Sequence, residues 1–167
     1  EFLIINSYKA WDFDKNVIDT YRSRYPDNFY TSIEERKNFY IKDDYPETLR
    51  PLIEEISKEK NFFINLLPVE GSLNGILELS KISELFICSS PVRENPYCIQ
   101  EKYDWIIKYL GKEFTKRFIC TRDKTLVFGD YLIDDKPEIK GIIENPFWYH
   151  IIFSRAYNEN INHKKRL

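Results

Sequence analysis

The sequence predicts an α/β protein: a parallel sheet flanked by helices, with a small helical cap inserted after the first strand. Short apolar runs typical of buried strands recur along the chain, the first of them at residues 3–5. Helical patterns separate several of the later runs, and strands that alternate with helices imply a parallel sheet with right-handed crossovers. A long polar stretch with interleaved aromatic residues, 14–65, follows the first run almost directly.

The individual elements follow from the same patterns. Prolines divide the stretch 14–65 into short helical pieces. One helix is expected from 72 to about 81, and a second, over 100–110, should end at Gly111, a good C-cap residue. The later strands are expected at 84–88, 117–120, 131–133 and 149–153. The expected domains are a core of residues 1–13 and 66–167 and a cap of residues 14–65.

Composition narrows the class of protein. The 167 residues are 43% hydrophobic and carry a formal net charge of −2. This length and apolar content suit one folded domain with a small inserted subdomain. A nucleic-acid-binding protein usually shows a basic stripe, which this sequence lacks, so no nucleic-acid partner is expected.

Targeting signals and cysteines indicate the compartment. The sequence shows no signal-peptide pattern and no apolar run long enough to cross a membrane, so we expect an intracellular, cytoplasmic protein with no membrane partner. The cysteines at 88, 98 and 120 have no metal-ligand spacing and fit a reducing compartment. Cys88 and Cys120 lie in apolar runs and are expected to be buried.

Polar side chains stand at or just after the ends of three predicted strands. Ser89 and Ser90 follow one strand, Lys124 comes shortly after the next, and Asp134 and Asp135 follow a third. In an open α/β sheet, ligands bind at the carboxyl ends of the strands. Hydroxyls, an ammonium group and paired carboxylates gathered there suit a phosphate group together with a divalent cation.

These residues belong to three longer motifs. The chain reads FICSSP at 86–91, TRDKT at 121–125 and LIDDKP at 132–137. In this order they resemble the motifs of the 5'(3')-deoxyribonucleotidases of the haloacid dehalogenase (HAD) superfamily, and the resemblance extends to about residue 153. It implies a HAD-like Rossmannoid sheet with a helical cap, Mg²⁺ as cofactor and a nucleoside monophosphate or phosphate as ligand.

The resemblance also implies roles for particular residues. Phosphate-binding side chains are implied at Ser89, Ser90, Arg93 and Lys124, and Mg²⁺ ligands at Asp134 and Asp135. Nucleoside contacts are implied at Phe13, Phe39, Tyr40 and Ile41. Packing between cap and core explains Phe13 equally well, whereas Tyr40, with its polar tip, is the better candidate for a ligand contact.

The first family motif, which carries the nucleophilic aspartate, is degenerate. Asn6 stands at the nucleophile position, and a neutral amide is a poor nucleophile. The chain contains no methionine, and one placed between Asn6 and Ser7 would restore the family spacing. The second catalytic position is then Ser7, or Tyr8 if no residue is missing. Losing a carboxylate should also weaken Mg²⁺ binding.

Three hypotheses for function remain open at this point. The main one is a catalytically inactive pseudo-phosphatase that retains binding of a nucleotide, phosphate or protein partner. The first alternative is a weakly active, Mg²⁺-dependent 5'-nucleotidase acting on deoxyribonucleoside monophosphates. The second is a structural scaffold or interaction protein whose pocket is filled by its own side chains. A homodimer is implied by the resemblance alone.

Overall fold

A five-stranded parallel sheet forms the centre of this computed structural model, which describes residues 2–6, 11–162 and 165–166. The strands lie in the order β3-β2-β1-β4-β5, and every neighbouring pair is parallel. The predicted parallel sheet and all five expected strands are confirmed. The strands are β1 (Phe2–Asn6), β2 (Glu84–Ser89), β3 (Phe118–Cys120), β4 (Tyr131–Asp134) and β5 (Tyr149–Ile152).

Within the described residues, four α-helices and several 3-10 helices accompany the strands. The two helices expected at 72–81 and 100–110 are present as α3 and α4, and Gly111 ends α4 with a positive φ of 90°. Its N–H donates to the carbonyls of Ile106 and Ile107, which satisfies the end of the helix as the sequence predicts. The α-helices are α1 (Phe13–Arg24), α2 (Arg50–Ile56), α3 (Ser72–Ile82) and α4 (Cys98–Leu110). The 3-10 helices in the part of the chain that the structure describes are η2 (Ile41–Asp44), η3 (Glu47–Leu49), η4 (Lys112–Arg117), η5 (Lys124–Leu126) and η6 (Ala156–Asn158).

The two faces of the sheet are buried differently. Side chains alternate between faces along each strand, so Leu3 and Ile5 pack in the larger core with Trp105 and Ile106 of α4. Ile4 points to the opposite face and belongs to a smaller cluster with Cys88, Leu132 and Trp148. The larger core fixes the sheet against α4 and therefore holds the carboxyl ends of the strands in place.

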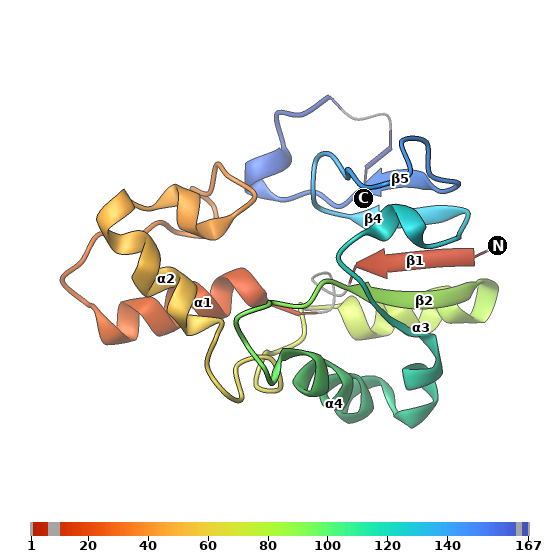
Figure 1. The fold of residues 1–167 in the computed structure, drawn as a ribbon, viewed down its shortest axis with the longest axis horizontal. Coiled ribbons are helices and arrows are strands. Elements are labelled where there is room, and N and C mark those ends of the chain that lie inside the picture. The colour runs from red at the N-terminus through yellow and green to blue at the C-terminus, as the bar shows by residue number, and fades with distance from the viewer. Residues whose placement is uncertain (1, 7–10, 163–164, 167) are drawn as a thin grey trace.

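The stretch after β1 forms a helical layer beyond the carboxyl ends of the strands. Helices α1 and α2 pack against each other, and Figure 1 shows both on the side toward which β1 points. The helical character expected for 14–65 is therefore present, while the division into a separate cap and core stays a prediction.

The cysteines are only partly as expected. Cys88 is buried, and burial raises the pKa of its thiol to about 11. Cys120 is exposed, so the expectation that it is buried is wrong. The physical reason is its position at the end of β3, one of the two edge strands of the sheet that the described residues form. Among the described residues, no helix combines the length and apolar character needed to span a membrane.

Candidate functional site

The carboxyl ends of the three central strands bring Asn6, Ser89 and Asp134 to one edge of the sheet. Strand β1 lies between β2 and β4, and each of these residues is the last of its strand. All three side chains are buried. The predicted gathering of polar residues at this edge is therefore present.

Asp134 is the most heavily engaged of these residues. Its Oδ1 accepts hydrogen bonds from Asn6 Nδ2 at 3.0 Å and from the Lys136 backbone N–H at 2.9 Å. Its Oδ2 forms a buried ion pair with Lys124 Nζ. Both carboxylate oxygens of Asp134 thus already have donors from the protein itself.

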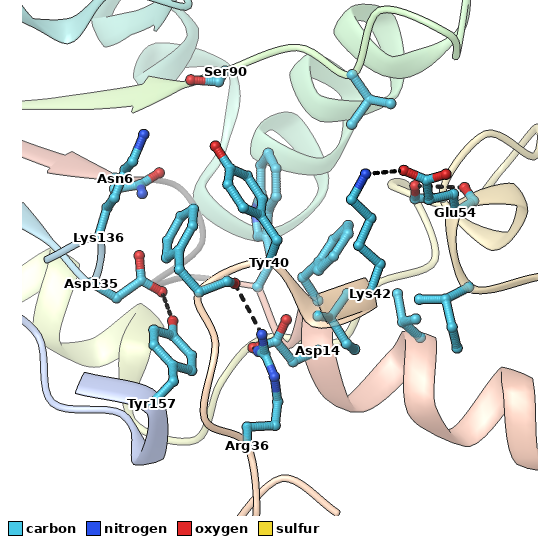
Figure 2. Close-up of a pocket in the computed structure, with 18 of the residues that line it drawn as sticks. Asn6, Asp14, Arg36, Tyr40, Lys42, Glu54, Ser90, Asp135, Lys136 and Tyr157 are labelled. Carbon is cyan, nitrogen blue, oxygen red and sulfur yellow. Dashed lines mark hydrogen bonds and ion pairs between the residues drawn. The ribbon is translucent and has the colours of Figure 1, made fainter. Parts of the chain in front are cut away.

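Asp135 is held by a residue that the sequence interpretation missed. Tyr157, on η6, donates from its hydroxyl to Asp135 Oδ2 at 2.5 Å (Figure 2). Burial, together with the nearby Asp135 charge, raises the pKa of Tyr157 above its ordinary value. Tyr157 therefore stays protonated and acts as a permanent donor to Asp135.

Ser89 ends β2 and Ser90 follows it, and their hydroxyls have different partners: Ser90 Oγ donates to the Thr121 carbonyl at 3.0 Å. Ser89 is fully buried, and its Oγ accepts a hydrogen bond from Lys102 Nζ at 2.8 Å. The same ammonium donates to the Ser90 carbonyl at 2.6 Å and lies over the ring of Phe63. Burial lowers the pKa of Lys102 to about 8. Through its two hydrogen bonds, Lys102 thus holds the chain in place where β2 ends.

A cavity of about 710 Å³ lies between the cap helices and these strand ends. This volume is in the range of small-molecule sites. Nine of the residues predicted for the site line it, while Ser89 and Asp134 lie buried outside its lining. The nine are Asn6, Phe13, Phe39, Tyr40, Ile41, Ser90, Arg93, Lys124 and Asp135. Ser7 and Tyr8, the two candidates for the second catalytic position, lie outside the described residues.

The aromatic residues of the cap form the opposite wall. Phe39 packs edge-on against Tyr40 and Tyr157, with ring centroids 5.0 and 5.9 Å apart. Figure 2 shows Tyr40 between Asn6 on one side of the cavity and Lys42 on the other. Phe13 lines the cavity but also packs on Phe62 at 5.4 Å, so it contributes to both the pocket and the core.

Arg36 positions this wall, and the sequence carried no signal that distinguished it from a surface arginine. Its buried guanidinium donates to the carbonyls of Asn38 and Phe39 at 2.7 and 2.9 Å. It also pairs with Asp14 and Asp44 and lies 4.7 Å from the centre of the Tyr157 ring. Arg36 therefore ties the loop that carries Phe39 to α1 and to η6.

The residues at the strand ends do not fit Mg²⁺ as they are arranged. Within the described ranges, no group of three or more His, Cys, Asp or Glu side chains is placed to hold a metal ion. Asp134, an expected ligand, is engaged by two N–H donors and an ammonium group. An amide stands at Asn6, where the family resemblance implies a carboxylate. Weakened Mg²⁺ binding therefore stays a prediction.

Comparison with known proteins gives one consistent family. The family model described as "5' nucleotidase, deoxy (Pyrimidine), cytosolic type C protein" matches residues 9–167, a range that begins after Asn6. A Bordetella pertussis protein named "Putative 5'(3')-deoxyribonucleotidase" is 43% identical over 157 residues, which cover 93% of this chain and 84% of that protein. The human mitochondrial 5'(3')-deoxyribonucleotidase is 36% identical over 156 residues, covering 90% of this chain and 68% of the human protein.

A solved structure is also similar. It is described as a "putative haloacid dehalogenase-like hydrolase" from Burkholderia xenovorans. The alignment has a TM-score of 0.45 and 16% sequence identity, and it covers 93% of this chain and 83% of the other.

Proposed function

The chain belongs to the 5'(3')-deoxyribonucleotidase family, and on that premise we propose that it binds deoxyribonucleoside monophosphates but hydrolyses them very slowly or not at all. One observation carries the proposal. Asn6 lies buried at the end of β1 and lines the cavity, and its amide donates to Asp134.

The binding half of the proposal rests on the two walls of the cavity. The cap wall offers the rings of Phe39 and Tyr40, and stacking of a base on an aromatic ring contributes about 1–3 kcal/mol. The wall at the strand ends offers Arg93 and Lys124, whose N–H donors and positive charge suit a phosphate. Ser90 lines the same wall, and its hydroxyl donates to the Thr121 carbonyl at 3.0 Å. The volume is ample for a mononucleotide.

The slow-hydrolysis half rests on the chemistry of Asn6. A carboxylate at this position would attack the phosphorus, displace the nucleoside alkoxide and form an aspartyl-phosphate. An amide is neutral and lacks that nucleophilicity, and in this structure its nitrogen faces Asp134. Loss of a catalytic nucleophile typically slows a reaction by about a thousandfold or more.

A thermal-shift titration with phosphate release followed in the same wells tests both halves. A ligand that binds only the folded state raises the melting temperature with occupancy. We expect deoxyribonucleoside monophosphates to raise it without measurable phosphate release. Hydrolysis at a rate ordinary for a phosphatase would contradict the slow-hydrolysis half, and no shift with any nucleotide would contradict the binding half.

Family membership favours a second candidate, a weakly active Mg²⁺-dependent 5'-nucleotidase. Its support is that the relatives are named as deoxyribonucleotidases and that the motifs carrying Ser90, Lys124 and Asp135 are intact. This candidate predicts slow phosphate release that EDTA abolishes. Release that is unchanged by EDTA and by Asp135→Asn would count against it.

A third candidate, a scaffold with a self-filled pocket, has less support, because a cavity of about 710 Å³ remains among the described residues. Sedimentation velocity can test whether the chain forms a homodimer or binds a protein partner.

For the compartment we propose an intracellular protein, since Cys88, Cys98 and Cys120 are all free thiols.

A further inference from the structure

The wall of the cavity at the strand ends carries more basic than acidic side chains. Five basic side chains from the segments at and after the strand ends line the cavity together with Asn6, and the same segments supply two lining carboxylates, Glu94 and Asp135. Asp134 lies buried just behind, and its charge is matched by Lys124. The five are Arg93, Arg122, Lys124, Lys136 and Arg155.

Most of this positive charge is not neutralised locally. Within the part of the chain that the structure describes, the cationic groups of Arg93, Arg122, Lys136 and Arg155 form no ion pair with a carboxylate, whereas Lys124 pairs with Asp134. Lys136 Nζ instead lies 5.6 Å from the centre of the Phe39 ring, at the junction of the two cavity walls. An anionic group entering this end therefore meets several cations at once.

The neutral amide of Asn6 keeps the number of negative charges beside Asp134 low. A carboxylate at that position would stand about 3 Å from Asp134 Oδ1, where like charges repel strongly unless a cation lies between them. The amide removes that charge and supplies a donor to Asp134 instead. Asn6, Lys136 and Lys124 then donate to the Asp134 carboxylate. These three protein donors compensate its charge, as a bound divalent cation would otherwise do.

We infer that this site binds the phosphate group of a nucleoside monophosphate without a divalent cation, its charge being compensated by the basic side chains. The inference rests on the proposed nucleotide binding and adds its mode. A phosphate monoester carries a charge of about −1.5 to −2 at neutral pH, and guanidinium groups bind such oxygens bidentately. Arg122, Lys136 and Arg155 supply that charge in place of the metal.

Calorimetric titration of deoxythymidine monophosphate into the full chain tests the inference. The dissociation constant should be the same within about threefold in EDTA and in saturating MgCl₂, the residual effect being ionic screening. Binding that tightens about tenfold or more with MgCl₂ would overturn the inference and leave the proposed function intact. Absence of binding in both media would overturn both.

The variant Asn6→Asp should reverse this behaviour. Restoring a carboxylate beside Asp134 should weaken binding in EDTA by about tenfold or more, and MgCl₂ should recover it. The control Asn160→Asp adds the same charge at an exposed position outside the cavity and should leave both titrations unchanged. If Asn6→Asp binds equally well in the two media, the inference is wrong.

A second pair of variants tests the cations directly. Lys136→Gln should weaken binding by roughly the same factor, about threefold to tenfold, in EDTA and in MgCl₂. Lys112→Gln removes an exposed lysine outside the cavity lining and should have no effect. Unchanged affinity in Lys136→Gln, with thermal unfolding showing an intact fold, would contradict the assignment of positive charge to phosphate binding.

Discussion

Replacing Arg36 by glutamine should both destabilise the protein and loosen the cap wall of the cavity, which carries Phe39 and Tyr40. The Arg36 side chain is almost fully buried and pairs with Asp14 and Asp44, and it donates to the carbonyls of Asn38 and Phe39. Removing one partner from a buried ion pair typically costs about 3–5 kcal/mol, because the other charge is left without compensation.

The expected magnitude lies at the lower end of that range. Asp44 keeps hydrogen bonds from the backbone N–H groups of Lys37 and Asn38 after Arg36 is lost, both at 3.0 Å. Asp14 is partly exposed, so water can solvate it. We therefore expect a loss of about 3 kcal/mol in the free energy of unfolding. For a chain of this size that corresponds to a fall of about 6–12 °C in the melting temperature.

Urea denaturation of matched variants provides the assay. Arg50 pairs with Asp43 at 3.8 Å, but both side chains are more than a third exposed, so Arg50→Gln should cost less than about 1 kcal/mol. Nucleotide titrations of the two folded variants should show weaker binding for Arg36→Gln and unchanged binding for Arg50→Gln, because Arg36 donates to the Phe39 carbonyl whereas Arg50 donates to the Tyr45 carbonyl. Equal stability and equal affinity of the two variants would refute this reasoning.

Three further outcomes are expected. A Cβ at Gly141 would lie 1.9 Å from Asp123 Oδ1, so Gly141→Ala should lower the free energy of unfolding in urea by about 1–3 kcal/mol, whereas Gly75→Ala, with open space in α3, should raise it by up to about 1 kcal/mol. Iodoacetamide should modify the exposed Cys120 before Cys88, as measured by peptide mass spectrometry, and the reverse order would contradict the burial pattern. Burial lowers the folded-state pKa of Lys102 to about 8 from its ordinary value of 10.5, so between these pH values the unfolded chain binds more protons than the folded one. The free energy of unfolding should therefore rise with pH across that window relative to Lys102→Met, and parallel profiles of the two proteins would show that Lys102 keeps an ordinary pKa.

The sheet and its flanking helices could be predicted because their signals are local. Apolar runs placed all five strands, and Gly111 marked the end of α4, where its positive φ is needed. The one error of burial, at Cys120, arose because an apolar run does not say which strand will lie at the sheet edge. Strand order depends on packing between distant segments, which a local pattern does not contain.

The candidate site could be predicted only in part, for the same reason. The motifs identified Asn6, Lys124 and Asp135, and the structure brings them into one cavity. They did not identify Arg36 or Tyr157, whose contacts join the cap loop, η6 and Asp135 through space. Contacts between residues so far apart in the chain produce no characteristic spacing or motif from which the sequence could predict them.

Ser89 shows a subtler difference. The resemblance implies a phosphate contact for its hydroxyl, whereas in the structure that hydroxyl accepts from Lys102 and lies outside the cavity lining. The phosphate role of Ser89 therefore stays a prediction. Sequence could place the residue at the strand end but could not say to which side its side chain would turn.

The most direct test of the central claim is phosphate release from deoxythymidine monophosphate by the wild-type chain and by Asn6→Asp, both in MgCl₂. The proposal is that the amide at Asn6 limits hydrolysis, so the variant should release phosphate at least about tenfold faster than the wild type, with Asn160→Asp as the charge-matched control. The gain stays below the full cost of a lost nucleophile because the second catalytic position, Ser7 or Tyr8, also lacks a carboxylate. Equal rates for wild type and Asn6→Asp, with the wild type hydrolysing the nucleotide efficiently, would contradict the claim.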